Sequence, residues 1–239
     1  GSGLVGSEMC IRDSNKTGGN NLTYDEIKKN KEVCECLKKG NENLGVLGFT
    51  DHSAAHCTMV AKRAAYILKK FGYSESDIEM VKIAGFMHDI GNVVNRSRHA
   101  EYGAILANEI LKETDMSLKD RITVVSAIGH HDESTGGATD PISAALIIAD
   151  KTDVRRNRVR NKAKENFDIH DRVNYAVTDA ALKINMDKKV IALNLQIDTK
   201  ICSMYEYFEI FLGRMMMCRG AAEVLGATFK LTANGSKVL

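Results

Sequence analysis

Proline is almost absent from this 239-residue sequence, in which Pro141 is the only one. Because proline breaks helices and marks turns, this scarcity, together with the lack of Gly-rich runs in the middle of the chain, argues against a many-turned all-β fold and favours long helices. The length suits one domain, or one domain with a small appendage, and 44% hydrophobic residues are enough for a core. We therefore expect a mainly α protein.

Net charge, ordered cysteines and long apolar runs are also lacking. With 33 Lys and Arg against 31 Asp and Glu, the net charge of +2 predicts neither stable nucleic-acid binding nor attraction to an anionic membrane. The six scattered cysteines form no disulfide framework or Cys-x-x-Cys cluster, which suits a reducing compartment. No apolar run approaches the roughly 20 residues that span a bilayer, and no signal-peptide pattern is present. We expect a soluble, cytoplasmic protein.

The first 14 residues, GSGLVGSEMCIRDS, resemble a cloning scar joined to translated sequencing adaptor of the kind found at the ends of metagenomic sequences. They are therefore excluded from the expected fold. The remaining chain divides into a helical domain over residues 15–186 and a C-terminal α+β appendage over residues 187–239.

Apolar periodicity predicts a series of helices in the first of these parts. The expected helices cover residues 24–39, the segment between Asp51 and Gly72, and residues 76–88, 99–113, 118–129, 141–150 and 171–184. In the helix over 118–129, Ile122, Val125 and Ile128 are expected to face inward. Pro141 suits the first position of its helix, after a capping Asp140.

The pattern changes near residue 190. Alternating apolar residues over 190–197 predict a strand, and residues 205–225 form an amphipathic helix with a Met-rich stripe. Asn234-Gly235, between apolar segments, is typical of a hairpin turn. We expect a small mixed sheet covered by the long helix.

Histidines are concentrated in one part of the chain. Six of the seven lie between residues 52 and 131, and most stand at the ends of predicted helices. Imidazole and carboxylate ligands together suit divalent transition metals such as Fe, Mn, Co, Ni or Zn, whereas Ca²⁺ and Mg²⁺ prefer oxygen. This clustering indicates a metal site.

The order His56, His88-Asp89 and Asp150 resembles the signature of the HD superfamily of metal-dependent phosphohydrolases, over roughly residues 50 to 160. The resemblance implies a helical HD-domain bundle in which these four residues bind one metal and Asp89 bridges to another. It further implies that His99, His130 and His131 bind the second metal. Two such ions can hold a hydroxide for in-line displacement at phosphorus, so Asp89 is also a catalytic candidate.

His52 lies one helical turn before His56 and can share its face. It is either a further ligand, at a position where three-metal members of the related HD-GYP group carry an acid, or a helix-start histidine bonded to backbone. HD-GYP proteins have Lys where this chain has Asn92, and the segment after His131 lacks Gly-Tyr-Pro, which argues against cyclic dinucleotide cleavage. Ala149-Asp150-Lys151 with Arg155 is similar to HD proteins that hydrolyse dinucleoside polyphosphates.

Basic and acidic residues beside the expected ligands are candidates for substrate contact and proton transfer. A basic run follows Asp150 and is either a solvated face or a phosphate-binding element, and its members are Lys151, Arg155, Arg156, Arg158, Arg160, Lys162 and Lys164. The expected substrate contacts are Lys151, Arg155, Arg158, Arg96 and Asn92. Asp132 and Glu133 are either catalytic groups, partners of metal-bound imidazole, or surface acids.

These residues favour a phosphohydrolase that cleaves a phosphoester or phosphoanhydride of a small phosphorylated or nucleotide substrate with a metal-bound hydroxide. One alternative is a di-iron oxygenase of the same superfamily. Another is a nucleotide-sensing module with little turnover, whose appendage signals to a partner or forms a homodimer. A second His-Asp pair, His170-Asp171, is expected only to begin a helix.

Overall fold

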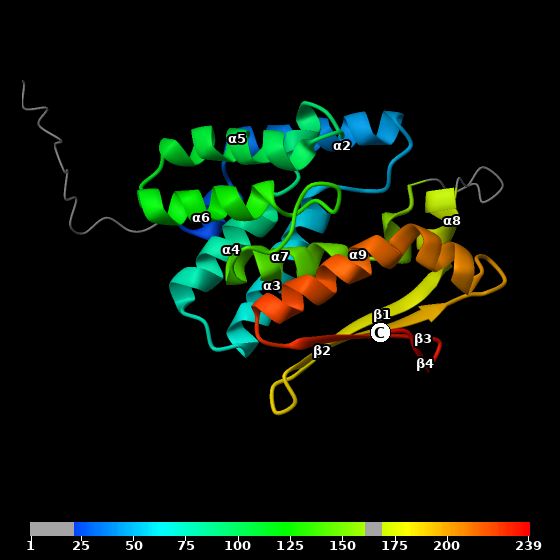
Figure 1. Cartoon of the computed structure of the whole chain (residues 1–239). Helices are drawn as coiled ribbons and strands as arrows, with labels where there is room; N and C mark the ends of the chain where they lie inside the picture. Colours follow the sequence, from blue (N-terminus) through cyan, green and yellow to red (C-terminus); the bar gives the residue numbers. More distant parts are fainter. Residues whose placement is uncertain (1–21, 161–168) are drawn as a thin grey trace, which may run out of the picture.

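The computed structural model describes residues 22–160 and 169–239 and places a stack of helices above one small sheet (Figure 1). The first part contains α1 (Tyr24–Ile27), α2 (Lys31–Val46), α3 (Ala54–Lys70), α4 (Glu75–Met87), η1 (Ile90–Val93), α5 (His99–Lys112), α6 (Leu118–Gly129), α7 (Pro141–Lys151), η2 (Arg156–Arg158) and α8 (Ile169–Ala176). The expected mainly α class is confirmed. The adaptor-like residues 1–14 lie outside the described residues.

The last part contains the sheet and one long helix: β1 (Val177–Asn185), β2 (Val190–Ile197), α9 (Met204–Val224), β3 (Thr228–Ala233) and β4 (Ser236–Lys237). The strand order is β1-β2-β3-β4, with β2 and β3 parallel and the other pairs antiparallel. The expected hairpin at Asn234-Gly235 is confirmed, since both residues have positive φ and join antiparallel strands. The expected mixed sheet is present.

Helix α7 lies at the centre of the molecule. Its sequence explains the start of the helix, because Asp140 caps it and Pro141 occupies the first turn. Every residue from Ile142 to Ala149 is buried, as α7 packs against α3, α4, α6 and α9. A helix buried on all sides holds its C-terminal Asp150 in a fixed place.

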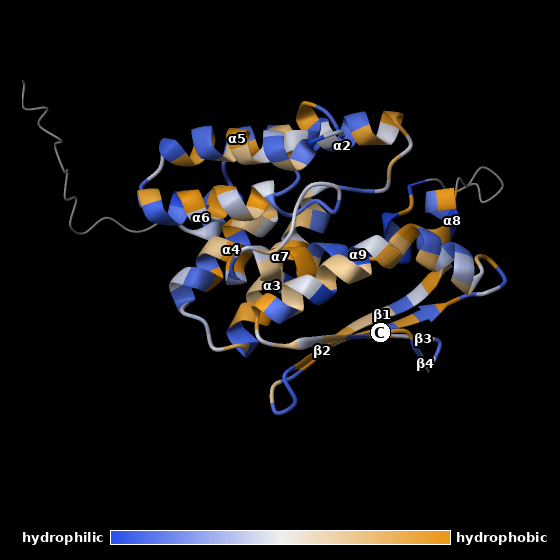
Figure 2. Ribbon diagram, viewed as in Figure 1, coloured by the Kyte–Doolittle hydropathy of each residue, from blue (hydrophilic) through white to orange (hydrophobic). Residues whose placement is uncertain are grey.

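Helix α9 lies between the helical bundle and the sheet (Figure 1), packing on α7 on one side and on β3 on the other. Ile191, Leu193, Leu195 and Ile197 of β2 are buried, as strand alternation predicts. Figure 2 shows hydrophobic residues along the central helices and hydrophilic residues at the β1–β2 turn. Within residues 22–160 and 169–239, none of the helices combines the length and apolar character needed to cross a bilayer.

Three sequence expectations are corrected. The helix expected over 24–39 is two helices, because the Asn30 side chain accepts the Val33 N–H at 3.1 Å and starts α2 anew. In α6, Ile128 is buried as predicted, but Val124 is also buried and Ile122 is 51% exposed, so the inward face is rotated from the predicted one.

The third correction concerns the helix expected over 171–184. Helix α8 ends at Ala176, and Val177–Asn185 instead form β1, paired with β2. The sheet therefore begins before residue 187, where the appendage was predicted to start. The division into a helical domain and an appendage stays a prediction.

Candidate metal centre

Helix ends bring the candidate ligands together. His56 lies in the first turn of α3, His88 follows α4, and Asp89 precedes η1. Asp150 lies in the last turn of α7, and His99 begins α5. His131 follows α6 by two residues. Residues that are far apart in sequence thus meet at one buried point.

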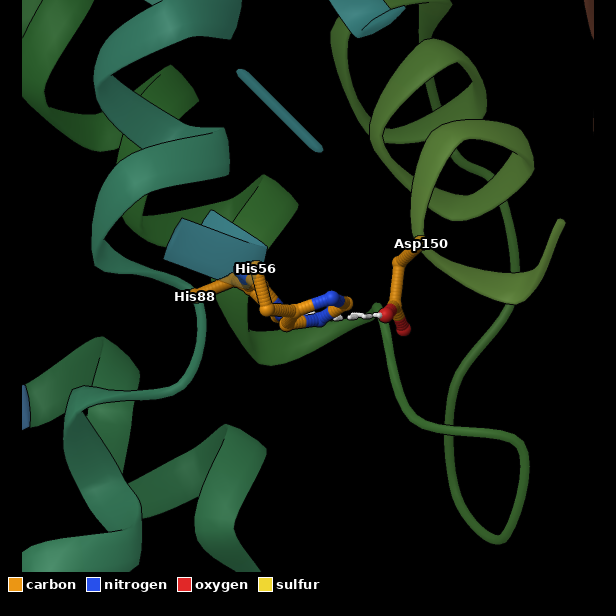
Figure 3. Close-up of side chains that lie close together, drawn as sticks. All are labelled: His56, His88 and Asp150. Carbon is orange, nitrogen blue, oxygen red and sulfur yellow. Dashed lines mark ion pairs between the residues drawn. The ribbon is translucent and has the colours of Figure 1, made fainter. Parts of the chain in front are cut away.

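The first group consists of His56, His88 and Asp150 (Figure 3). The two imidazole rings point toward the Asp150 carboxylate, whose Oδ1 lies 3.2 Å from His56 Nε2 and 3.7 Å from His88 Nε2. Asp89 Oδ2 lies 3.2 Å from His88 Nε2 and 3.7 Å from His56 Nε2. These are the four residues of the predicted first metal site.

The second group consists of Asp89, His99 and His131. The Nε2 atoms of His99 and His131 lie 3.1 Å apart, and Asp89 Oδ1 lies 3.7 Å from His99 Nε2. Asp89 therefore directs one oxygen toward each group. This is the arrangement expected of a carboxylate shared by two metal ions.

All four imidazoles in these groups use Nδ1 for a bond to the protein. The acceptors are Asp153 Oδ2 for His56 at 2.8 Å, Gly85 O for His88 at 2.9 Å, Arg96 O for His99 at 3.1 Å and Ile128 O for His131 at 2.6 Å. An Nδ1–H that donates to oxygen leaves the Nε2 lone pair of a neutral ring free. Four such nitrogens face the same interior.

The donor atoms fit a divalent transition metal. Among the described residues, the buried atoms His56 Nε2, His88 Nε2 and Asp89 Oδ2 have no hydrogen-bond partner, a costly arrangement that a bound cation relieves. Ligands in adjacent positions on a metal are about 3.0 to 3.4 Å apart when each is about 2.1 Å from it, the range from octahedral to tetrahedral coordination. The spacings of 3.1 and 3.2 Å lie within this range.

The pKa values of His131 and Asp89 suit metal binding, whereas that of His88 opposes it. Burial, with the nearby charge of His88, lowers the pKa of His131 to about 3, so its ring is neutral. Burial opposes ionisation of Asp89, but the neighbouring His88 and His52 hold its pKa well below the usual range. Burial likewise lowers the pKa of His88, but Asp89 outweighs it and raises that pKa. A metal at His88 must displace this proton.

Cys57 also lies beside His88 and Asp89. Burial raises the pKa of its thiol. Since the thiolate is the form that binds metals, a thiol kept neutral is a poor ligand.

Asp153 is a site residue that the sequence did not reveal. It is buried, accepts the bond from His56 Nδ1, and receives Arg155 Nε at 2.5 Å and Nη2 at 3.0 Å. Although burial raises its pKa, the bonds from His56 and Arg155 hold that pKa well below the usual range. A carboxylate behind a metal-binding imidazole fixes the ring and raises its basicity. The available signal was an acid one turn after Asp150.

The basic residues predicted to contact substrate have other partners. Arg155 binds Asp153 with two nitrogens, and the buried Arg158 donates to Asp153 O at 2.9 Å and Asp51 O at 3.1 Å. Both therefore support Asp153, and their contact with substrate stays a prediction. Arg156 and Arg160 likewise donate to backbone carbonyls of Tyr175 and Phe49. Lys162 and Lys164 lie outside the described residues.

Asn92 and Arg96 lie beside Asp89. The buried Asn92 donates to Asp89 Oδ1 at 2.8 Å and to Asp89 O at 3.0 Å, so it orients the shared carboxylate. Its contact with substrate stays a prediction. The Arg96 guanidinium is half-buried, 3.5 Å from Asn92 Oδ1 and over the Phe49 ring. Arg96 thus remains available at the edge of the site.

Lys151 and Asp132 also lie beside the candidate ligands, and Glu133 pairs with Lys151. The buried Lys151 ammonium lies 2.9 Å from Asp150 Oδ2 and 2.6 Å from Glu133 Oε2. Asp132 Oδ1 is 3.9 Å from His99 Nε2, and Asp132 also accepts a bond from Ser134. Glu133 further pairs with Arg214 of α9, a residue that sequence reasoning missed.

Two predicted ligands are not in either group. His130 bonds to Ser126 O through Nδ1 at 2.9 Å, and His52 bonds to Thr50 O at 2.7 Å, with its ring centroid 5.7 Å from that of His56. Among the residues that the structure describes, neither joins a set of potential metal ligands. His170 and Asp171 lie in the first turn of α8 and are likewise outside these sets, in line with the expected helix-start role.

The fold and the site together define a mainly helical protein with a buried His and Asp centre suited to divalent metals. Residues 54–158 match the HD domain family. An uncharacterized protein of Methanocaldococcus jannaschii is 31% identical over 191 residues, which cover 70% of this chain and 73% of that protein. The chain belongs to the HD-domain superfamily of metal-dependent phosphohydrolases.

More distant similarity extends to two proteins named Ribonuclease Y. That of Enterococcus faecalis is 30% identical over 115 residues, covering 47% of this chain and 20% of the relative. That of Latilactobacillus sakei is 30% identical over 118 residues, covering 48% and 20%. The chain matches only a fifth of the length of either relative.

Proposed function

We propose that this protein is a phosphohydrolase that uses two divalent transition-metal ions to cleave a phosphoester or phosphoanhydride of a nucleotide-type substrate. The observation that carries the proposal is the convergence of four imidazole Nε2 atoms with the carboxylates of Asp89 and Asp150. His56, His88 and Asp150 would hold one ion, His99 and His131 the other, and Asp89 both. Ions so bound acidify water and neutralise charge on a phosphoryl group.

The protein's own residues then position the reacting groups. Asn92 fixes Asp89 Oδ1, and Asp153 fixes the His56 ring, so the ligand atoms keep their places during turnover. Burial raises the pKa of Asp132, but the Ser134 bond and the charge of Lys151 outweigh it and lower that pKa. A carboxylate in this state suits accepting a proton from the attacking water better than donating one.

A cavity lined in part by Asn92, the residue that donates to Asp89, supports the proposed substrate class. It measures about 320 Å³, and its walls include Asn92 and Arg96 together with the apolar Leu44, Leu47 and Val94. Apolar walls with one guanidinium fit a ring system that carries an anionic group, since guanidinium binds phosphate oxygens with paired hydrogen bonds. A nucleotide has both parts.

The relatives named Ribonuclease Y support phosphodiester cleavage as one form of this activity. The similarity covers about half of this chain and a fifth of each relative. RNA therefore belongs among the substrates to be tested, although the small net charge of +2 favours a small molecule over a polyanion.

The test is a hydrolysis panel of nucleoside phosphates, dinucleoside polyphosphates, cyclic nucleotides and a short RNA, run anaerobically with Mn²⁺ or Co²⁺. We expect the wild type to release product and Asp89→Ala to lose both bound metal and turnover, because Asp89 serves both groups. Asp187→Ala, on an exposed turn, is the matched control. A metal-loaded, fully active Asp89→Ala protein would sink the assignment, and activity that requires O₂ would favour the oxygenase alternative.

A further inference from the structure

Four alternating charges connect the C-terminal helix α9 to the metal centre. Arg214 Nε lies 2.8 Å from Glu133 Oε1, Glu133 Oε2 lies 2.6 Å from Lys151 Nζ, and Lys151 Nζ lies 2.9 Å from Asp150 Oδ2. The other oxygen of Asp150 faces His56 and His88. The series begins outside residues 54–158, the range that matches the HD domain.

The middle of this series is buried. The Lys151 side chain is only 6% exposed, and a buried ammonium is stable only with nearby compensating charges. Asp150 and Glu133 provide them at 2.9 and 2.6 Å. Lys151 therefore occupies one oxygen of Asp150 and leaves the other for metal, provided that Glu133 stays in place.

Glu133 has few restraints of its own. It lies on the segment after α6, its side chain is 28% exposed, and within the described residues its ion pairs are with Lys151 and Arg214 alone. Arg214 is better fixed, because it extends from a helix packed on both faces and its guanidinium lies over the Phe211 ring. Arg214 on α9 is thus the rigid ion-pair partner that restrains Glu133.

We propose that Arg214 is a positioning residue of the metal centre. It holds Glu133 so that Lys151 stays beside Oδ2 of Asp150, the oxygen that does not face His56 and His88. Helix α9, which lies outside the HD domain, then completes a site whose ligands all lie within that domain. This inference rests on the metal centre of the proposed function and adds to it a residue that touches neither metal nor substrate.

The test is titration of the metal-free full-length protein with Co²⁺, followed by visible absorption. We expect Arg214→Gln to weaken Co²⁺ affinity by about tenfold, as is typical when a partner behind a ligand is removed, and to alter the absorption band. Arg214→Lys should restore part of the loss. Arg219→Gln, on the same helix and paired only with Glu223 in the described structure, should bind as the wild type does.

The direction of the effect is informative. If Arg214 acted only through its charge, removing that charge would strengthen cation binding, so tighter or unchanged Co²⁺ affinity in Arg214→Gln would overturn the proposal. Circular dichroism checks that each variant is folded.

A second experiment tests whether Arg214 acts on the metal centre through Glu133. In a Glu133→Gln background, Arg214→Gln should have no further effect on Co²⁺ affinity, since coupled residues are not additive. An equal loss in both backgrounds would contradict this route. A wild type that binds no Co²⁺ would overturn the metal centre and this inference together, whereas one that binds Co²⁺ but hydrolyses nothing would remove only the proposed activity.

Discussion

Each metal-facing nitrogen in this protein depends on a bond at the other end of its ring. For His88, His99 and His131 that bond goes to a backbone carbonyl. For His56 it goes to the buried carboxylate of Asp153, which Arg155 holds in turn, while Arg158 donates to the Asp153 backbone carbonyl. His56 is therefore the ligand whose orientation depends most on side chains that can be changed by mutation.

Asp153→Asn should weaken metal binding and lower turnover by about 10- to 100-fold, the usual effect of losing a partner behind a ligand. The amide keeps the size of the side chain but loses the charge that stabilises His56 and Arg155. Metal affinity by calorimetry and initial rates measure the two effects. Asp187→Asn is the control, and an Asp153→Asn protein equal to it in both measurements would show that Asp153 has no part in the site.

The ligands themselves could be predicted from the sequence, because His56, His88-Asp89 and Asp150 form an ordered set. Asp153 and Arg214 could not, since their roles depend on which side chains lie within 3 Å after folding. For the same reason, the contacts of Arg158 could not be predicted. Its place in a basic run predicted phosphate contact, whereas folding buries it against the Asp51 and Asp153 carbonyls.

At the scale of elements, η1 and α5 meet backbone to backbone at Gly91. A Cβ at this position would lie 2.0 Å from His99 O and 2.4 Å from Gly103 N. The approach brings Asp89, just before η1, toward His99 at the start of α5. Only glycine permits this contact, which assembles the second group of ligands.

Gly91→Ala should therefore lower the free energy of unfolding by about 1–3 kcal/mol or more, because the methyl group must push the two elements apart. It should also weaken metal binding, since Asp89 and His99 move with those elements. Urea denaturation and metal titration provide the measurements. Gly137→Ala, where a Cβ would meet nothing within 4 Å, is the control, and equal stability of the two variants would contradict the close approach.

Most elements followed from local signals such as Ser74 with Asp77 at the start of α4, or Asp140-Pro141 at the start of α7. The strand that follows Ala176 could not be predicted in this way. Its Ala180, Leu182 and Lys183 suit a helix, but pairing with β2 draws them into a strand. Tertiary contacts of this kind are not visible in a local pattern.

At the scale of the whole molecule, the fold gathers helix ends from His56 to Asp150 around the buried helix α7. Helix α9 joins the C-terminal sheet to the helical bundle, because it packs on α7 and reaches the surroundings of the site through Arg214. Periodicity predicted both the helical class and the mixed sheet. It could not predict where the sheet and α9 sit against the bundle, because that depends on the complementarity of buried surfaces.

Anomalous X-ray diffraction from Mn²⁺- or Co²⁺-loaded crystals tests the central claim most directly. We predict two peaks, one among His56 Nε2, His88 Nε2 and Asp150 Oδ1, and one beside the Nε2 atoms of His99 and His131, with Asp89 contacting both. The absence of a peak at the first group in fully loaded crystals, or peaks only at surface carboxylates, would contradict the metal centre.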